Sequence, residues 1–412
     1  MKMRACLAAA VLLASTAQAD STFYTIEKYT LTALGTFGGD ESVALDINDA
    51  REIVGWAHTH DGKQAPFLYA GGEMQNLSFL GPEGEATGIN NHSQVVGNVW
   101  TAQQSHRAFI WQDGLLKLLP DQLPGWVNAE VKERLDEGLC WIWTKATAIS
   151  DSSLISGNIH IERKEGFTDR CYFTLAVDPV LWTTPETIKV FHDVSKGPVP
   201  TLLHDVNSAG TAVGYSYDLP WGVLFYYHFQ EDDPPLPVPG PGWKHTDDAF
   251  GINEHGHVVG WYTAHPSSRV GAATHRAFWW DGAYRVIDIG VLPTGEQAVA
   301  HDVNDQDFVV GYGHVLIDRP PPLEPVRVNR GFLYHEKLGL YVLPAPFTSG
   351  SKPYACEAYA LTNFNARSGL VSIVGFCETP KRRAVRWDVK LAEVSVPPVC
   401  CTQPAFEDRI SR

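Results

Sequence analysis

The feature of this sequence that most constrains its fold is a short motif repeated along the chain. The motif joins a small residue and Ile-Asn, or a close variant, to a turn and an apolar pair that ends in Gly. Two nearly identical copies are GINNHSQVVG at 88–97 and GINEHGHVVG at 251–260. A motif that returns at long intervals is typical of a protein built from one structural unit used many times.

Six copies share the same internal spacing, because an Asn, or Ser150 in the third copy, lies seven residues before the Gly. The six pairs are Asn48 and Gly55, Asn90 and Gly97, Ser150 and Gly157, Asn207 and Gly214, Asn253 and Gly260, and Asn304 and Gly311. A looser seventh copy runs from AYALTN at 358–363 to IVG at 373–375. Successive copies begin about 42 to 60 residues apart. The sequence therefore predicts seven units of one repeat.

A second motif follows each copy of the first and consists of an aromatic-rich strand, a turn and another apolar strand. Clear examples are HRAFIWQDGLLKLLP at 106–120 and HRAFWWDGAYRVIDIG at 275–290, with variants at 65–81, 330–344 and 382–394. Asp-Gly, Gly-Gly and Leu-Gly between the strands favour hairpin turns. Each unit is thus predicted to form four short strands, with the Asn bonding its own backbone in the turn and the Gly permitting close backbone approach or a bulge.

Four strands in each of seven units predict an all-β fold, a seven-bladed β-propeller made of residues 20–399 as a single domain. Six or eight blades, or an open solenoid, are the alternatives if the divergent third unit is miscounted. The segment YTLTALG at 29–35 resembles the fourth strand YRVIDIG at 284–290. It is therefore a candidate to complete the last blade and close the ring, and LAEVSV at 391–396 is the other candidate.

The charge balance excludes one class of partner. The chain has 47 acidic and 32 basic residues and a formal net charge of −15. Because phosphate binding needs a basic face, we expect no nucleic-acid partner.

The first residues have the pattern of a secretory signal peptide. Lys2 and Arg4 precede an apolar run at 7–14, and Ala17-Gln18-Ala19 supplies small residues for cleavage. This predicts a signal peptide over 1–19, a mature chain from about Asp20, and a secreted or periplasmic location. The apolar run is too short to span a bilayer, and no later segment is long and apolar enough to do so.

Six cysteines follow the predicted signal peptide, and an even number in an oxidising compartment favours disulfides. Cys140 with Cys171, and Cys356 with Cys377, are close enough in sequence to pair. Cys400 and Cys401 begin a C-terminal tail, 400–412, and are predicted to tie that tail elsewhere or to cross-link chains. No C-x-x-C pair occurs, so we expect no zinc site, and no motif indicates a cofactor.

The chain resembles the HAF-repeat family of bacterial proteins, for which an extracellular location is expected. ALGTFGGDESVALDIN at 33–48 matches the opening of that repeat, and Ala108-Phe109 and Ala277-Phe278 match its Ala-Phe core. Arg107 and Arg276 stand where the family has the His of its name. The resemblance implies secretion and β-repeat architecture, and it carries no catalytic residues.

Three stretches interrupt the repeat, and such loops are where binding residues concentrate. PGWVNAEVKERLDEG at 124–138 places Val127, Val131 and Leu135 four residues apart, which predicts a short helix. A surface loop is the alternative. The Pro-rich stretches at 231–243 and 318–327 are predicted to be extended connectors.

The strongest chemical pattern is His-Asp-Val-Asn, which occurs twice on predicted innermost strands. His204 with Asp205, and His301 with Asp302, are candidates for metal binding or proton transfer, since imidazole near carboxylate supports both. The equivalent positions hold packing residues, Leu45, Thr87, Thr147, Phe250 and Tyr359, which favours a structural role. No nucleophile-elbow, zinc-protease, P-loop or dinucleotide motif is present.

Two pairs of tryptophans are candidates for sugar stacking, Trp141 with Trp143 and Trp279 with Trp280. Packing between strands is the alternative, and we favour it. His255 and His257 flank Gly256 at a predicted hairpin tip without further recognisable metal ligands.

The sequence predicts a secreted binding or scaffold module for a glycan or protein partner. The main alternative is a secreted polysaccharide-degrading enzyme, a lyase or hydrolase, with His204 and His301 near the channel. A purely structural surface protein joined through Cys400 or Cys401 is a third interpretation.

Overall fold

The structure is a computed structural model in which every regular element of the described residues is a β-strand. The described residues are 21–78, 83–100, 106–121, 140–163, 176–190, 201–216, 226–228, 238–239, 248–264, 274–319, 324–346 and 353–396. The helix predicted at 124–138 lies outside them, and the Pro-rich stretches at 231–243 and 318–327 are described only in part.

The first three repeats each fold into one antiparallel sheet whose strands pair in chain order. The first sheet contains β2 (Gly38–Ile47), β3 (Ile53–Thr59), β4 (Gln64–Ala70) and β5 (Glu73–Asn76). The second contains β6 (Gly84–Ile89), β7 (Val95–Trp100), β8 (His106–Gln112) and β9 (Leu115–Leu118). The third contains β10 (Cys140–Ile149), β11 (Ile155–Arg163), β12 (Ala176–Thr184) and β13 (Thr187–Val190).

The next three repeats follow the same order. The fourth sheet contains, within the described residues, β14 (Thr201–Val206), β15 (Thr211–Ser216) and β16 (Tyr226–His228). The fifth contains β17 (Asp248–Ile252), β18 (Val258–Ala264), β19 (Thr274–Trp280) and β20 (Val286–Gly290). The sixth contains β21 (Ala298–Val303), β22 (Val309–Ile317), β23 (Val326–His335) and β24 (Gly339–Val342).

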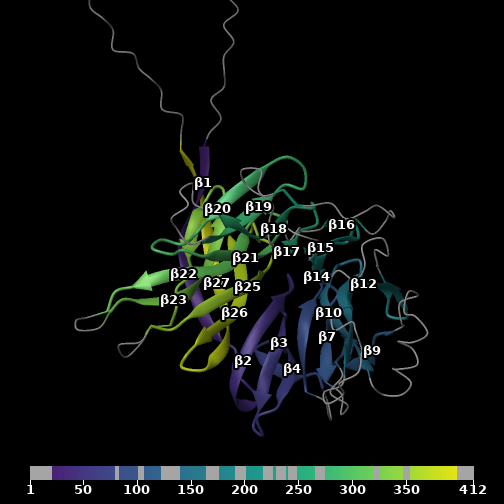
Figure 1. The fold of residues 1–412 in the computed structure, drawn as a ribbon. Coiled ribbons are helices and arrows are strands. Elements are labelled where there is room, and N and C mark those ends of the chain that lie inside the picture. Colours follow the sequence, from purple (N-terminus) through teal and green to yellow (C-terminus); the bar gives the residue numbers. More distant parts are fainter. Residues whose placement is uncertain are drawn as a thin grey trace, which may run out of the picture.

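The seventh sheet joins the two ends of the chain. Its order is β25 (Cys356–Leu361), β26 (Leu370–Glu378), β27 (Arg382–Val396) and then β1 (Ser21–Ala33). The N-terminal strand is therefore the outermost strand of the last sheet, and LAEVSV forms the end of the third strand. Of the two candidates for the strand that closes the ring, the N-terminal segment therefore fills that place, and LAEVSV belongs to the strand beside it. Figure 1 shows the sheets arranged around a common centre in chain order.

The apolar core of the described residues is divided among eight clusters, which together fill the seven contacts between neighbouring sheets. One cluster joins the seventh sheet to the first through Ala360, Val374 and Ala384 on one side and Ala44, Ile53 and Phe67 on the other. Because each sheet buries both faces against its neighbours, its strands are rich in consecutive apolar residues. The first sheet thus has the same kind of contact with the last as with the second.

The repeated Asn forms the turn between the first and second strands of a sheet. In the fifth sheet, Asn253 Oδ1 accepts hydrogen bonds from the N–H groups of His255 and His257 at 3.0 and 2.9 Å. The Asn253 N–H donates to the carbonyl of His257 at 3.0 Å. The fourth residue of the turn has positive φ, as at Gly256 and Asp307. The predicted bonding of this Asn to its own turn is therefore confirmed.

The repeated Gly lies where two backbones touch. A Cβ atom on Gly311 would lie 2.0 Å from the carbonyl oxygen of Val299 on the adjacent strand and 2.9 Å from the ring of Phe332. The same steric conflict, at 1.9 to 2.2 Å from a backbone oxygen, occurs at Gly55, Gly97, Gly157, Gly214, Gly260 and Gly375. Only a residue without a side chain fits here, which confirms the close approach predicted from the sequence.

Cys356 and Cys377 form a disulfide across β25 and β26, as predicted from their spacing. The side chain of Cys140 and all of Cys171, Cys400 and Cys401 lie outside the described residues. A search of the described residues finds no helix long and apolar enough to cross a membrane. The prediction of an all-β propeller built from four-stranded antiparallel units is confirmed by these sheets.

We predict that Gly311→Ala lowers the free energy of unfolding by about 3 kcal/mol, because the new methyl group must displace a backbone carbonyl. Denaturant unfolding followed by tryptophan fluorescence measures the change. Gly331→Ala is the matched control on β23, since its nearest contacts are the Ala358 and Leu343 side chains at 3.2 Å. Equal losses in the two variants would contradict this explanation.

Candidate functional site

The turns between first and second strands meet around one end of the ring and form a closed circle of hydrogen bonds. We call this end, formed by residues 48–52 and their equivalents, the turn end. In six turns the residue after the repeated Asn, or after its equivalent Thr362, donates its N–H to a side chain of the next turn, and in the third turn the donor is Ser152, two residues after Ser150. Asp49 donates to Asn91 Oδ1 at 2.9 Å, and Asn91 donates to Asp151 Oδ1 at 2.8 Å.

The circle continues through the remaining sheets and returns to its start. The links are Ser152 N to Ser208 Oγ at 3.2 Å, Ser208 N to Glu254 Oε2 at 3.0 Å, Glu254 N to Asp305 Oδ1 at 3.0 Å and Asp305 N to Asn363 Oδ1 at 3.0 Å. Asn363 N then donates to Asp49 Oδ1 at 2.7 Å. Each sheet is thereby held to both neighbours.

The repeated Asn adds a second, buried set of links. Asn48 Nδ2 donates to the carbonyl of Asn90 at 3.1 Å, and Asn90 Nδ2 donates to that of Ser150 at 3.0 Å. The same bond joins Asn207 to Asn253, Asn253 to Asn304 and Asn304 to Thr362. Ser150 and Thr362 lack an amide and cannot extend the set.

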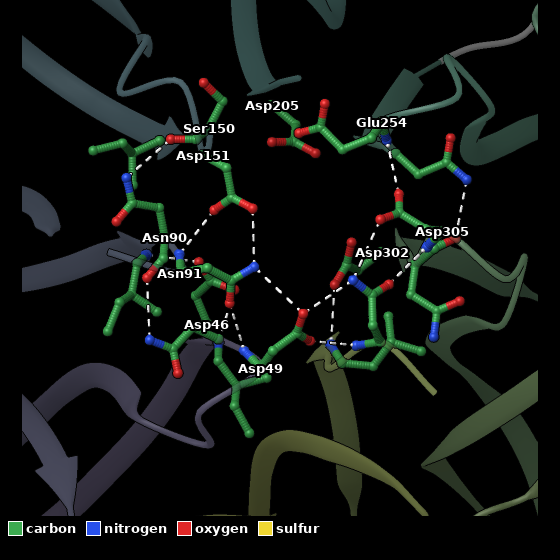
Figure 2. A pocket seen from close by; sticks show the side chains of 18 of the residues that line it. Asp46, Asp49, Asn90, Asn91, Ser150, Asp151, Asp205, Glu254, Asp302 and Asp305 are labelled. Atoms are coloured by element: carbon green, nitrogen blue, oxygen red, sulfur yellow. Dashed lines mark hydrogen bonds between the residues drawn. The ribbon is translucent and has the colours of Figure 1, made fainter. Parts of the chain in front are cut away.

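A cavity of about 160 Å³ lies inside this circle. It is lined by Asp46, Asn48, Asp49, Asn90, Asn91, Ser150, Asp151, Asp205, Asn253, Glu254, Asp302, Asn304, Asp305 and Asn363, together with the apolar residues between them. None of the lining residues is Lys, Arg or His. Figure 2 shows side chains of the lining arranged in a ring around an open centre. Because the lining contains seven carboxyl groups and no basic side chain, the cavity is strongly acidic.

Three carboxyl groups in the cavity wall bind backbone N–H groups of two sheets at once. Every first strand has a register irregularity at this level, such as that between Ala44 and Asp46. Asp46 accepts from its own neighbour Ile47 N–H at 2.8 Å and, in the next sheet, from Ile89 N–H at 2.8 Å. The carboxyl group therefore bridges the first and second sheets.

Asp205 and Asp302 repeat this arrangement. Asp205 accepts from the N–H groups of Val206 and Ile252 at 2.8 and 2.9 Å. Asp302 accepts from those of Val303 and Leu361 at 2.7 and 3.0 Å. Both carboxyl oxygens of Asp46, Asp205 and Asp302 therefore accept hydrogen bonds from backbone N–H groups.

Desolvation raises the pKa of all three carboxyl groups. Burial and then the charge of Asp302 raise the pKa of Asp205 to about 7, and burial raises that of Asp302 to about 6. Burial, with Asp302 next, raises the pKa of Asp46 well above its usual value. The hydrogen bonds from backbone N–H groups oppose these shifts without cancelling them.

His204 and His301 lie on β14 and β21, one residue before Asp205 and Asp302 and therefore further from the turn end. Phe250 stands between them, with its ring centre 4.8 Å from each imidazole, so the two His side chains do not meet. His301 also contacts Tyr312 and Tyr359, at 5.4 and 5.0 Å. Burial, and secondarily the charge of His204, lower the pKa of His301 to about 3, so it is neutral at ordinary pH.

Two acidic residues accompany these rings. His204 Nε2 lies 3.1 Å from Asp248 Oδ1, and both side chains are partly exposed. Tyr359 donates its hydroxyl hydrogen to Glu357 Oε2 at 2.6 Å. The sequence places His204 beside Asp205, whereas the structure pairs it with Asp248 of the next sheet. We call this wall, formed by His204, Asp248, Phe250, His301, Glu357 and Tyr359, the aromatic wall.

The three tryptophans whose side chains are described, Trp143, Trp279 and Trp280, do not form one surface. Trp279 and Trp280 are 7% and 6% exposed and pack between strands, so neither offers an indole face to a sugar. Trp143 stacks on His160 with ring centres 3.5 Å apart, and the Trp141 side chain lies outside the described residues. At the turn end, His257 Nδ1 lies 2.6 Å from Asp307 Oδ1 and takes part in a link between sheets.

No group of three or more His, Cys, Asp or Glu side chains within the described ranges converges closely enough to hold a metal ion. The sequence reasoning missed the circle of turn residues and the pairing of His204 with Asp248. The only available signal for the circle was the polar residue that follows each repeated Asn.

No family model and no curated protein matches this chain. Among solved structures, it is similar to the Pyrococcus horikoshii acylaminoacyl peptidase, with a TM-score of 0.49, 8% identity, and coverage of 86% of this chain and 52% of that chain. The chain thus spans about half the length of that peptidase.

Two further similarities are to proteins of other kinds. The β-propeller domain of the Trilobed protease from Pyrococcus furiosus gives a TM-score of 0.46, 10% identity, and coverage of 92% of this chain and 100% of that chain. SapL1 lectin in complex with alpha methyl fucoside gives a TM-score of 0.27, 8% identity, and coverage of 87% and 98%.

We predict that Asn253→Ala lowers the free energy of unfolding by about 3 kcal/mol, because it removes a buried link between sheets and leaves the turn N–H groups of His255 and His257 without their acceptor. Asn253→Ser should cost less, since a hydroxyl can still accept, as Ser150 Oγ does from Leu154 N–H at 3.2 Å. Thermal and urea unfolding measure both. A Ser variant as unstable as the Ala variant would argue against the acceptor role.

Proposed function

We propose that the protein is an exported, seven-bladed propeller that binds a glycan or protein partner at the end of the channel opposite the turn end. The closed circle of turn bonds and the apolar contacts between each sheet and the next support a ring of seven blades. The disulfide between Cys356 and Cys377 and the signal-peptide pattern at 1–19 support export to an oxidising compartment.

The choice of end is supported by the connections between strands. At the turn end the connections are short, as at 48–52, 71–72 and 113–114. Several connections of ten or more residues join described strands at the opposite end, at 119–139, 164–175, 191–200 and 343–355. Because variable loops on a rigid scaffold carry most binding residues, that end is the better binding face.

The aromatic wall carries the proposal, because it is the part of the channel that combines partly exposed rings with polar groups. Phe250 and Tyr359 supply ring faces and edges, and Asp248 and Glu357 supply acceptors. A few polar groups among aromatic side chains are typical of sites for small molecules and sugars. By contrast, every carboxyl oxygen of Asp46, Asp205 and Asp302 already accepts a backbone hydrogen bond.

We predict that Phe250→Ala weakens binding by about fivefold, since one lost aromatic contact is worth about 1 kcal/mol. The measurement is retention of purified residues 20–412 on a panel of envelope polysaccharides and proteins, followed by titration of the ligand found. Tyr284→Ala is the matched control, because Tyr284 is 98% exposed on the turn at 281–285, at the turn end. Equal weakening by both variants would rule out the aromatic wall as the site.

A polysaccharide-degrading enzyme is the second candidate, and the contacts of His204 with Asp248 and of Tyr359 with Glu357 favour it. A His oriented by a carboxylate can transfer protons at neutral pH. New chain ends released from a polysaccharide, and lost in His204→Ala at unchanged melting temperature, are the expected result for an enzyme. Polymer retained without cleavage would leave the binding role alone.

A further inference from the structure

The three bridging aspartates lie on sheets that are never adjacent, and the reason is visible in their hydrogen bonds. Asp46, Asp205 and Asp302 belong to the first, fourth and sixth sheets. Each satisfies the inward N–H of its own sheet and of the next, so the next sheet needs no aspartate. The corresponding residues there are Gly88, Gly251 and Ala360.

The three carboxyl groups also share one confined space. They line the same cavity of about 160 Å³, whose lining contains no basic side chain. Further acidic groups face them from the turns, namely Asp49, Asp151, Glu254 and Asp305. Glu254 is the acidic neighbour that acts on Asp205, and Asp305 the one that acts on Asp302. Ionising all three would concentrate negative charge where nothing in the wall compensates it.

We propose that Asp46, Asp205 and Asp302 form a proton-dependent clamp. The ring is most stable when these carboxyl groups are protonated, and it loosens as they ionise, because the repulsion and desolvation of their uncompensated charges outweigh the stronger hydrogen bonds that carboxylates accept from backbone N–H groups. The clamp is separate from the aromatic wall and does not depend on the proposed function. It is a property of the scaffold that makes the stability of the ring depend on pH.

The direction of the effect follows from proton linkage. A carboxyl group whose pKa is higher in the folded protein than in the unfolded chain stabilises the fold fully below about pH 4, the ordinary value. That stabilisation is lost as pH rises through the folded values of about 6 for Asp302 and about 7 for Asp205. The buried His160 and His301, with pKa values lowered to about 3, have the opposite slope up to about pH 6.5.

The histidines give the stability a pH dependence of opposite sign to that of the clamp, and they are present in every variant. The test therefore compares the natural chain with Asp302→Asn and Asp205→Asn over pH 5 to 8, so that the contribution of the histidines cancels. Equilibrium urea unfolding gives the ratio of folded to unfolded protein at each pH. Between pH 5 and pH 8 the ratio of folded to unfolded protein is expected to fall at least about tenfold further in the natural chain than in either variant. The reason is that each unit by which the pKa is raised in the folded protein contributes a factor of ten. Asp40→Asn, an exposed carboxyl on the same strand as Asp46, is the control and should follow the natural chain.

Parallel pH profiles for the natural chain and both cavity variants would overturn the proposal. If the variants do not fold, the natural chain alone decides, through a carbon-13 titration of its labelled aspartate carboxyl groups. At least one carboxyl group titrating above pH 5.5 in the folded protein is expected. Because these groups interact, the midpoints belong to the set and need no individual assignment. Titration of every aspartate below pH 5 would refute the clamp.

Discussion

The hydrogen bond from Asn363 N–H to Asp49 Oδ1 is the contact on which the ring depends, because it joins the last turn to the first. Every other link in the circle connects consecutive repeats and would form equally well in an open array. A bond from a backbone N–H to a carboxylate is stronger than one between neutral groups. Here it is reinforced by Asn363 Nδ2, which donates to Asp49 Oδ2 at 3.1 Å. Without this closure, the core shared by the first and seventh sheets would face water.

The parts of the fold that depend on local geometry could be predicted from the sequence. Asn253 bonds within its own turn and Gly311 touches the strand beside it, so each leaves a fixed spacing in the repeat. The bonds between sheets leave no such pattern, because Asp, Asn, Ser and Glu all serve as acceptors in the circle. For the same reason the pairing of His204 could not be inferred, since its partner Asp248 lies on the next sheet. The sequence suggested that Asp205 and Asp302 form a chemical site together with His204 and His301. In the structure the carboxyl oxygens of the two aspartates accept hydrogen bonds from backbone N–H groups instead.

The two ends of the channel differ in how freely their residues can change. At the turn end the side chains of the circle bond to a neighbouring sheet, so a substitution of one of them disturbs two sheets. On the aromatic wall, the positions equivalent to His204 hold Leu45, Thr87, Thr147, Phe250, His301 and Tyr359, which share no chemistry. Variation at a fixed position of a rigid scaffold is what a surface adapted to one particular partner requires. The repeat thus separates the residues that hold the ring from those available for recognition.

The pairing of Ser21 with Val396 has a consequence for the order in which the molecule can form. β1 is the first strand to emerge during synthesis, yet its only strand partner, β27, is among the last. Closing so long a loop is slow in comparison with forming the hairpins between them. The six preceding sheets can therefore assemble one after another while β1 waits as a single unpaired strand. Its exposed edge includes Glu27 and Lys28 at an irregularity in the register, and such features discourage pairing with the wrong strand during that delay.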